Sequence, residues 1–275
     1  MNESNEPDEA NARDPLGSLV GAARFAAAGF VVVVGTVVVL ATGWAPLRVR
    51  GARLAGWVVT GMARTATTLF GVRIVCDQPE RLRLHRGFVF PNHVSFVDIL
   101  VLLHLFPLRF LSNHVVERTL FVGWVAKAIG TVFVDRRDSE ARAEARRELA
   151  DALAEQDHPP LVLFPEGRIG EGEVLHPLRR GAFEVAAEGA IPYLLCAIRY
   201  SDLDAVHWRR REPFFAALWR LARHRGPLTA RLVFLGSVHP TPADDPDALV
   251  RHAESLLGAA ISTPRGDATA GAAGP

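Results

Sequence analysis

The 275-residue chain has only two cysteines, Cys76 and Cys196, and no excess of either charge. No C-x-x-C pair and no His/Cys cluster at metal-ligand spacing accompanies them, so both are interpreted as buried structural thiols and no metal site is expected. The 31 Lys and Arg offset 30 Asp and Glu, for a formal net charge of +1. Because no global positive field results, no nucleic-acid partner is expected.

Charged residues are absent from the stretch 25–47. These 23 residues are long enough to cross a hydrocarbon core of about 30 Å as a helix, so they are the best transmembrane candidate. Residues 1–17 before them are acidic and polar and are expected to be disordered. A cleaved signal peptide is less favoured, because the start of the chain is acidic and the apolar run is too long.

A second apolar stretch, 54–72, carries one charge, Arg64. It suits a helix that packs back against the first or lies in the membrane interface, and a second full span is the weaker alternative. Residues 18–72 are therefore predicted to form a membrane anchor. Arg48, Arg50 and Arg53 follow the first stretch, which predicts that the rest of the chain lies on the cytoplasmic face of the cell (inner) membrane.

Residues 73–261 alternate strand-like and helix-like segments, which predicts an α/β domain with a mixed, largely parallel sheet flanked by helices on both faces. Strands are expected at 72–76, 87–90, 109–112, 131–135, 161–164, 192–200 and 228–236. Helices are expected at 96–106, 118–130, 139–156, 180–190 and 244–260. The tail, 262–275, has low complexity and is expected to be unfolded.

The stretch FPNHVSFVDIL places His93 and Asp98 five positions apart. The spacing alone is weak evidence, because His239 and Asp244 repeat it where Asp244 is predicted to cap a helix. His93, however, follows an expected strand and Asp98 opens the next helix, at the kind of sheet edge where α/β folds bind ligands. There an imidazole can take a proton from a hydroxyl while the carboxylate fixes its tautomer. Ser95 is interpreted as a turn or capping hydroxyl, since no G-x-S-x-G elbow is present.

The motif NHVSFVD resembles the first motif of the glycerolipid acyltransferases, the 1-acyl-sn-glycerol-3-phosphate acyltransferase family. Further segments follow in that family's order: GTVFVDR (130–136), FPEGR (164–168), LRRGAF (178–183) and IPYLL (191–195). The resemblance covers residues 88–200. It departs in the third motif, where the family usually has F-P-E-G-T-R-S: Arg168 stands in the threonine position and Ile169 in the arginine position.

The resemblance implies that His93 is the general base on the free hydroxyl of a lysophospholipid and that Asp98 orients it. The hydroxyl then attacks the thioester of acyl-CoA or acyl carrier protein, with no cofactor and no covalent intermediate. The expected reaction converts lysophosphatidic acid to phosphatidic acid. Because the third motif departs from the family pattern, another lysolipid, such as a lyso-aminolipid, is the alternative acceptor. A non-catalytic lipid-binding membrane protein with the same fold is the alternative from another class.

The same resemblance implies five substrate-binding residues. Arg136 and Arg168 would bind the acceptor phosphate, although each could instead pair with a nearby acid, Asp135 or Glu166. Glu166 would hold the loop or a glycerol hydroxyl, Gly167 would allow a close backbone approach, and Pro192 would line an acyl groove.

The segment 206–226 mixes six arginines with aromatic residues, which suits the headgroup layer of an anionic membrane. A core-packing helix with solvated arginines is the alternative. Membrane lipids are therefore expected partners, and the sequence indicates no oligomeric state.

Overall fold

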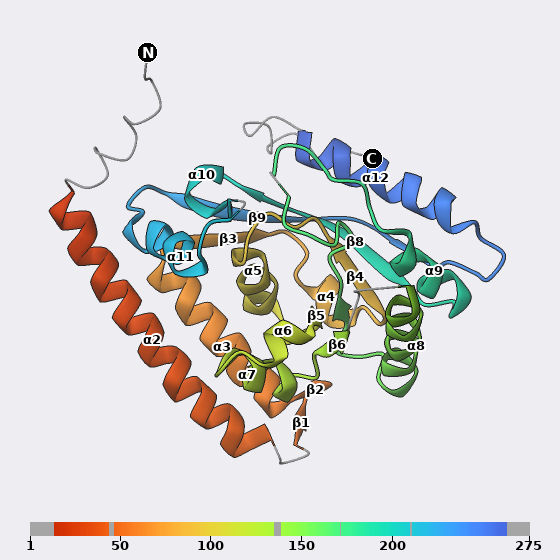
Figure 1. Cartoon of the computed structure of the whole chain (residues 1–275), viewed down its shortest axis with the longest axis horizontal. Helices are drawn as coiled ribbons and strands as arrows, with labels where there is room; N and C mark the ends of the chain where they lie inside the picture. Colours follow the sequence, from red (N-terminus) through yellow and green to blue (C-terminus); the bar gives the residue numbers. More distant parts are fainter. Residues whose placement is uncertain (1–13, 44–46, 135–138, 171, 210, 263–275) are drawn as a thin grey trace, which may run out of the picture.

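The computed structural model describes residues 14–43, 47–134, 139–170, 172–209 and 211–262. Their strands include a seven-stranded sheet with the order β3-β9-β8-β4-β7-β5-β6 (Figure 1). Only the β8–β9 pair is antiparallel in this sheet, so the mixed, largely parallel sheet predicted from the sequence is confirmed. The strands are β3 (Val72–Cys76), β4 (Phe88–Pro91), β5 (Arg109–Asn113), β6 (Val132–Val134), β7 (Leu161–Val162), β8 (Tyr193–Tyr200) and β9 (Leu228–Val238).

Helices cover both faces of the sheet, as predicted (Figure 1). On one face lie α3 (Leu54–Leu69), α5 (Val97–Leu105), α7 (Val122–Ala128) and α11 (Phe214–Arg223), with α2 (Pro15–Gly43) outside them. On the other face lie α8 (Ser139–Glu155), α9 (Arg180–Glu188) and α12 (Pro246–Ser262). Shorter elements are β1 (Arg48–Val49), β2 (Ala52–Arg53), α4 (Glu80–Leu84), α6 (His114–Glu117) and α10 (Leu203–Val206).

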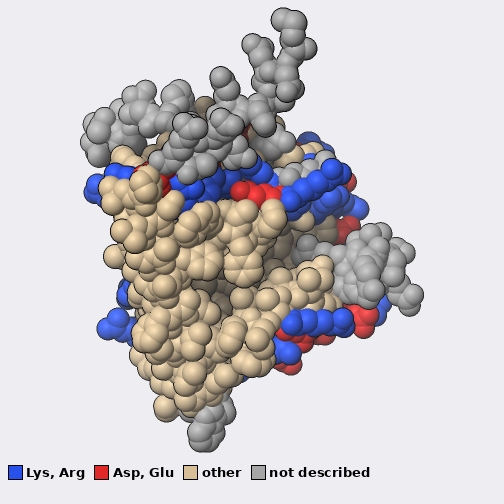
Figure 2. Space-filling view, turned by 60° about the vertical axis from the view of Figure 1, so that its left-hand side comes forward, with Lys and Arg blue, Asp and Glu red and all other residues tan. Residues whose placement is uncertain are grey.

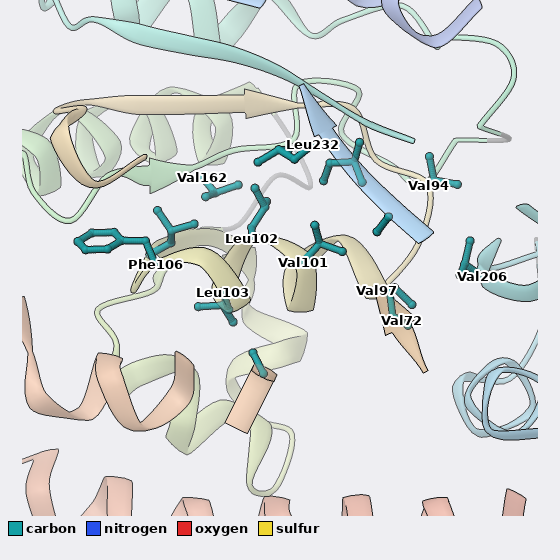
Figure 3. Close-up of a cluster of buried hydrophobic side chains, with 14 of the residues drawn as sticks. Val72, Val94, Val97, Val101, Leu102, Leu103, Phe106, Val162, Val206 and Leu232 are labelled. Carbon is teal, nitrogen blue, oxygen red and sulfur yellow. The ribbon is translucent and has the colours of Figure 1, made fainter. Parts of the chain in front are cut away.

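The central strands are apolar on both sides, because successive side chains point to opposite faces and both faces are covered. In β4, Val89 joins the core under α5 while Phe88 and Phe90 join the core under α9. Figure 3 shows Val101 and Leu102 of α5 turned toward the strands. This packing fixes the start of α5 against the carboxyl end of β4.

Helix α2 packs along the domain over its length (Figure 1). Near its start, the Arg24 guanidinium donates to the carbonyls of Ala222 and His224 at the end of α11, at 3.1 and 2.6 Å. In its second half, Gly35 permits the close approach of Met62 on α3, since a Cβ there would lie 2.4 Å from the Met62 sulfur. The helix is therefore held against the domain near its start and in its second half.

The bounds of α2 differ from those predicted. The helix includes residues 15–17, which the sequence placed in a disordered segment, and it is described as far as Gly43; residues 44–46 lie outside the described residues. Predicted disorder at 1–13 and 263–275 lies outside the described residues. Among the described helices, α2 alone is long and apolar enough to cross a membrane. Helix α3 packs back against it, as the sequence predicts for the second apolar stretch.

Candidate active site

His93 and Asp98 meet in the loop between β4 and α5. The strand ends at Pro91 and α5 begins at Val97, so Asp98 lies in the first helical turn. The His93 Nδ1 lies 2.9 Å from the Asp98 Oδ2. The His93 side chain is 15% exposed, whereas that of Asp98 is fully buried. The predicted pair therefore forms, with the imidazole at the surface of the site and the carboxylate behind it.

Asp98 is held by four hydrogen-bond donors. Its Oδ2 accepts from His93 Nδ1 and from the backbone N–H groups of Val94 and Ser95, at 2.7 and 2.9 Å. Its Oδ1 accepts from the Tyr200 hydroxyl at 2.6 Å. Such charge-assisted bonds stabilise a buried carboxylate.

These contacts set the tautomer of His93. An ionised carboxylate can only accept hydrogen bonds, so the imidazole proton lies on Nδ1 and the lone pair lies on Nε2. Burial and the neighbouring Asp98 raise the pKa of Tyr200 well above its usual value of 10, which keeps this hydroxyl protonated as a donor. The arrangement leaves a basic nitrogen on the exposed side of the ring.

A second loop, between β7 and α9, holds the backbone of His93. The buried Glu166 accepts from the His93 N–H at 2.8 Å and from the His176 N–H at 3.1 Å. Gly170 donates its N–H to the His93 carbonyl at 2.6 Å, and the Phe164 ring stacks on the imidazole with centroids 3.8 Å apart. Burial raises the pKa of Glu166, and its two backbone hydrogen bonds oppose that rise. Glu166 thus holds the loop, one of its two predicted roles.

Ser95 has the structural role that the sequence favoured. Its buried hydroxyl donates to the Val206 carbonyl at 2.5 Å and accepts from the Val97 N–H at 3.2 Å, where it supports the turn into α5. Two other polar residues were missed. Asn92 exchanges two hydrogen bonds with the backbone of Ile198, and Tyr200 reaches Asp98 from the end of β8. The only signal for Tyr200 in the sequence is its place at the carboxyl end of an expected strand.

The other residues predicted at the site are Gly167, Arg168, Arg136 and Pro192. Gly167 has a left-handed φ of +68°, and a Cβ there would lie 3.2 Å from the Arg179 side chain. Arg168 is exposed and contacts the His176 Nδ1 at 2.9 Å, whereas Glu166 accepts from backbone N–H groups. Arg136 lies outside the described residues.

The structure does not bring Pro192 to His93. The Pro192 carbonyl accepts from the Phe88 N–H at 2.9 Å, at the start of β4 and β8. These strands are parallel, so His93 follows the opposite end of β4, roughly 16 Å away for five strand residues. Pro192 therefore lies at the opposite edge of the sheet from His93, and its role in lining an acyl groove stays a prediction.

Two cavities border the loop 164–170. The basic cavity, about 460 Å³, is lined by Phe164, Gly167, Arg146, Arg179 and Arg180 among others. Arg146 and Arg180 both contact Glu184.

The mixed-charge cavity, about 1160 Å³, adjoins the other side of the loop. It is lined by Arg168, Ile169 and Gly170 together with the carboxylates of Asp202, Asp204 and Glu212. Asp202 caps α10 and Glu212 pairs with Arg220, whereas Asp204 has no partner among the described residues. Among the described residues, no group of three or more His, Cys, Asp or Glu could hold a metal ion.

An α/β fold with a His–Asp dyad at a strand-to-helix loop defines a class of acid–base enzymes, and the sequence comparisons specify the family. Residues 73–199 match the sequence model of the family described as Acyltransferase. This match and the similarity to curated relatives support the acyltransferase family that the ordered motifs predict.

Curated relatives carry two names. The chain is 34% identical over 151 residues to a lyso-ornithine lipid O-acyltransferase of Pseudomonas aeruginosa, with 54% of each chain covered. It is 25% identical over 210 residues to a 1-acyl-sn-glycerol-3-phosphate acyltransferase of Neisseria gonorrhoeae, covering 74% of this chain and 80% of that one. The chain thus spans about half the length of the first relative and most of the second.

A solved structure has the same fold. The crystal structure of the 1-acyl-sn-glycerophosphate (LPA) acyltransferase PlsC from Thermotoga maritima matches with a TM-score of 0.65 at 19% identity, covering 91% of this chain and 95% of that chain.

Proposed function

We propose that this protein moves a fatty acyl group from acyl-CoA or acyl carrier protein to the free hydroxyl of lysophosphatidic acid, giving phosphatidic acid. The observation that carries the proposal is the His93–Asp98 geometry, in which a buried carboxylate holds Nδ1–H and leaves Nε2 basic. The family match supports the reaction class. The relatives named as 1-acyl-sn-glycerol-3-phosphate acyltransferases support the acceptor.

The chemistry needs one base and a positioned thioester. His93 Nε2 takes the proton of the lysolipid hydroxyl while the oxygen attacks the thioester carbonyl. The tetrahedral intermediate then collapses to the ester, the carbon–sulfur bond breaks, and the imidazolium returns its proton to the leaving thiolate. Asp98 stabilises the imidazolium, and general base catalysis of this kind contributes about 10²- to 10⁴-fold. The scheme uses no cofactor, metal or covalent intermediate.

Arginines near the loop support a phosphate-bearing acceptor. Arg146, Arg179 and Arg180 line the basic cavity beside Phe164, whose ring stacks on His93. Guanidinium groups bind phosphate oxygens through paired N–H donors. Val134, the last residue of β6, lines the same cavity, and Arg136 follows it in the sequence. We propose Arg136 as a further phosphate ligand here, and Arg168 as a phosphate ligand that faces the mixed-charge cavity instead.

A lyso-aminolipid is the second candidate acceptor. The mixed-charge cavity combines Arg168 with the carboxylate of Asp204, which has no partner among the described residues, and an ammonium group needs such an anion. The relatives named lyso-ornithine lipid O-acyltransferases support this alternative.

We further propose that the protein lies on the cytoplasmic face of the cell membrane with α2 along the surface. Helix α2 contacts α11 near its start and α3 in its second half, so a span perpendicular to the membrane would draw the domain into the bilayer. Single cysteines at Leu19 and Leu47, in a chain with Cys76 and Cys196 replaced by serine, test this. Both should react with an impermeant maleimide from the same side, whereas labelling from opposite sides would show a span.

The acyl-transfer proposal is tested with purified protein in vesicles, labelled acyl donors and a panel of lysolipids, with products identified by mass. His93→Ala should lose about 10²- to 10⁴-fold in turnover while it remains folded and membrane-bound. His239→Ala is the matched control, because His239 has the same spacing to an aspartate but lies elsewhere on the surface. Unchanged turnover in His93→Ala would contradict the mechanism.

The same panel separates the alternatives. Lyso-ornithine lipid used in place of lysophosphatidic acid would change the acceptor and keep the reaction class, and Asp204→Asn should then raise KM for it. If the wild-type protein binds vesicles but acylates none of the lysolipids, the non-catalytic alternative holds.

A further inference from the structure

Large apolar side chains are exposed on one side of the protein. They come from α2, from α6, α7 and the turn between them, and from the start of α11, and include Phe30, Val37, Val115, Leu120, Val122, Trp124, Phe214 and Phe215. Figure 2 shows this side as a broad surface without charged residues, hollowed near its middle and bordered mostly by Lys and Arg, with some Asp and Glu among them. An extended apolar surface with a basic border suits a membrane containing anionic lipids.

An apolar groove of about 380 Å³ lies in this surface, within the size range of small-molecule sites. Its walls include residues of six helices: Ala28 and Val32 of α2, Met62 of α3, Leu103 of α5, Val116 of α6, Ala126 of α7 and Leu218 of α11. Among its described lining residues, Ser112 and Thr131 alone have polar side chains. The lining offers no charge and few hydrogen bonds, so its chemistry matches a hydrocarbon chain.

The groove extends to the catalytic loop. Phe96 and Ile99 belong to its lining, and Asp98 lies between them in the sequence, with its side chain turned into the core. Ile99 is 36% exposed even though it is next to the fully buried Asp98. The start of α5 therefore presents the carboxylate to His93 on one side and apolar side chains to the groove on another.

We propose that this groove binds the hydrocarbon chain of the acceptor lysolipid, which enters sideways from the membrane. The inference rests on the proposed function. The acceptor lies in the bilayer, whereas the donor arrives from water on a soluble carrier, so the groove continuous with the membrane surface fits the acceptor. Moving a chain from lipid into the groove gains little hydrophobic free energy, so the effect is to position the hydroxyl near Nε2.

Two alanines of α2 offer a matched pair of variants. Ala28 lines the groove, and Ala26 is exposed outside it. Ala28→Trp should lower kcat/KM at least tenfold for an acceptor with a 16-carbon chain and leave a 6-carbon acceptor unchanged, because the short chain gains nothing from the groove. Ala26→Trp should change neither. Ala126→Trp fills the groove from α7 and should repeat the result if Ala28→Trp fails to fold.

Acyl donors of different chain length show whether the groove holds the acceptor chain or the donor chain. The dependence of kcat/KM on donor chain length should be unchanged in Ala28→Trp. If the loss instead grows with donor chain length, the groove holds the donor chain and the proposal is wrong. An equal loss for all acceptors, or none, would also overturn it.

A binding experiment keeps the test independent of turnover. His93→Ala protein in vesicles is irradiated with a 16-carbon lysophosphatidic acid that carries a diazirine at the chain end, and adducts are mapped by mass spectrometry. Adducts should fall on groove residues of α5 and α7, and both Ala28→Trp and excess unlabelled 16-carbon lysolipid should remove them. Adducts confined to the exposed side of α2 would refute the groove. If wild type acylates no lysolipid yet the groove is labelled, only the proposed function fails.

Discussion

Asp98→Asn separates the charge of the dyad from its geometry. In the wild type, Oδ2 accepts three N–H bonds and Oδ1 accepts one O–H bond. With the amide oxygen in the Oδ2 position, the three N–H donors keep an acceptor, and the amide N–H group can donate to the Tyr200 oxygen once that hydroxyl rotates. Four hydrogen bonds remain possible, and the negative charge is lost.

The magnitude follows from the distance between Nδ1 and Oδ2, 2.9 Å. At an effective dielectric constant of about 20, two unit charges at this distance attract by roughly 6 kcal/mol. Proton transfer is incomplete in the transition state, and half this energy, about 3 kcal/mol, corresponds to roughly a 150-fold lower kcat. Asp98→Ala is less informative, because it would leave three buried donors unsatisfied at about 1–3 kcal/mol each.

The assay compares kcat with thermal unfolding of the same preparations in detergent. Asp98→Asn should unfold close to the wild type and should show the lower kcat at every pH. A folded variant whose kcat stays within threefold of the wild type would refute the electrostatic role of Asp98.

Three further variants test the supporting contacts. Tyr200→Phe removes a hydrogen bond to a buried carboxylate and should lower the free energy of unfolding by about 1.5–3 kcal/mol in denaturant titrations. Burial raises the pKa of the Glu166 carboxyl above 4.5, so the folded state keeps the carboxyl proton to a higher pH than the unfolded state does. The free energy of unfolding should therefore fall as the pH rises from about 4.5 through the raised pKa. This fall should be missing when Glu166→Gln is unfolded over the same pH range. Gly167→Ala forces a Cβ into a left-handed position and should lower stability by about 1–2 kcal/mol in thermal unfolding.

The sequence could predict the fold because its local signals agree. Apolar runs bounded by turns mark strands that are covered on both faces, and helices between them require parallel connections. The same reasoning from parallel strands could have predicted on which edge of the sheet Pro192 lies. A residue that opens a parallel strand lies at the opposite sheet edge from residues that follow parallel strands, so strand direction alone separates Pro192 from His93.

Spacing could not identify the dyad, because His239 and Asp244 have the same spacing and a different role. Asp244 accepts from the Thr241 N–H and hydroxyl, and the helix cap predicted for it belongs to the next residue, Asp245, which accepts from the Ala248 N–H at 3.2 Å. Tyr200 was beyond sequence reasoning for another reason. It lies 102 residues from Asp98, and its contact depends on the pairing of β8 with β4.

The composition of α2 also could not decide whether this helix crosses the membrane or lies along its surface. A helix of this length and apolarity can cross a bilayer or lie along it, and only packing distinguishes the two. The basic aromatic segment 206–226 shows the same limit: α11 buries Ala217 and Leu221 in the core and also exposes Phe215. One face of α11 therefore packs in the core, as the second interpretation expects, whereas its contact with a membrane stays a prediction.

The altered third motif moves an arginine by one residue within the lining of one cavity. Arg168 and Ile169 line the same mixed-charge cavity, so a guanidinium at either position borders the same space. The one-residue shift therefore keeps a positive charge beside the loop that holds His93. Selection between a phosphate and an amino head group then depends on what faces that arginine, and Asp204 is the carboxylate in this cavity without a partner among the described residues. A dianionic phosphate is repelled by Asp204 and an ammonium is attracted, so Asp204→Asn should improve the first acceptor and weaken the second.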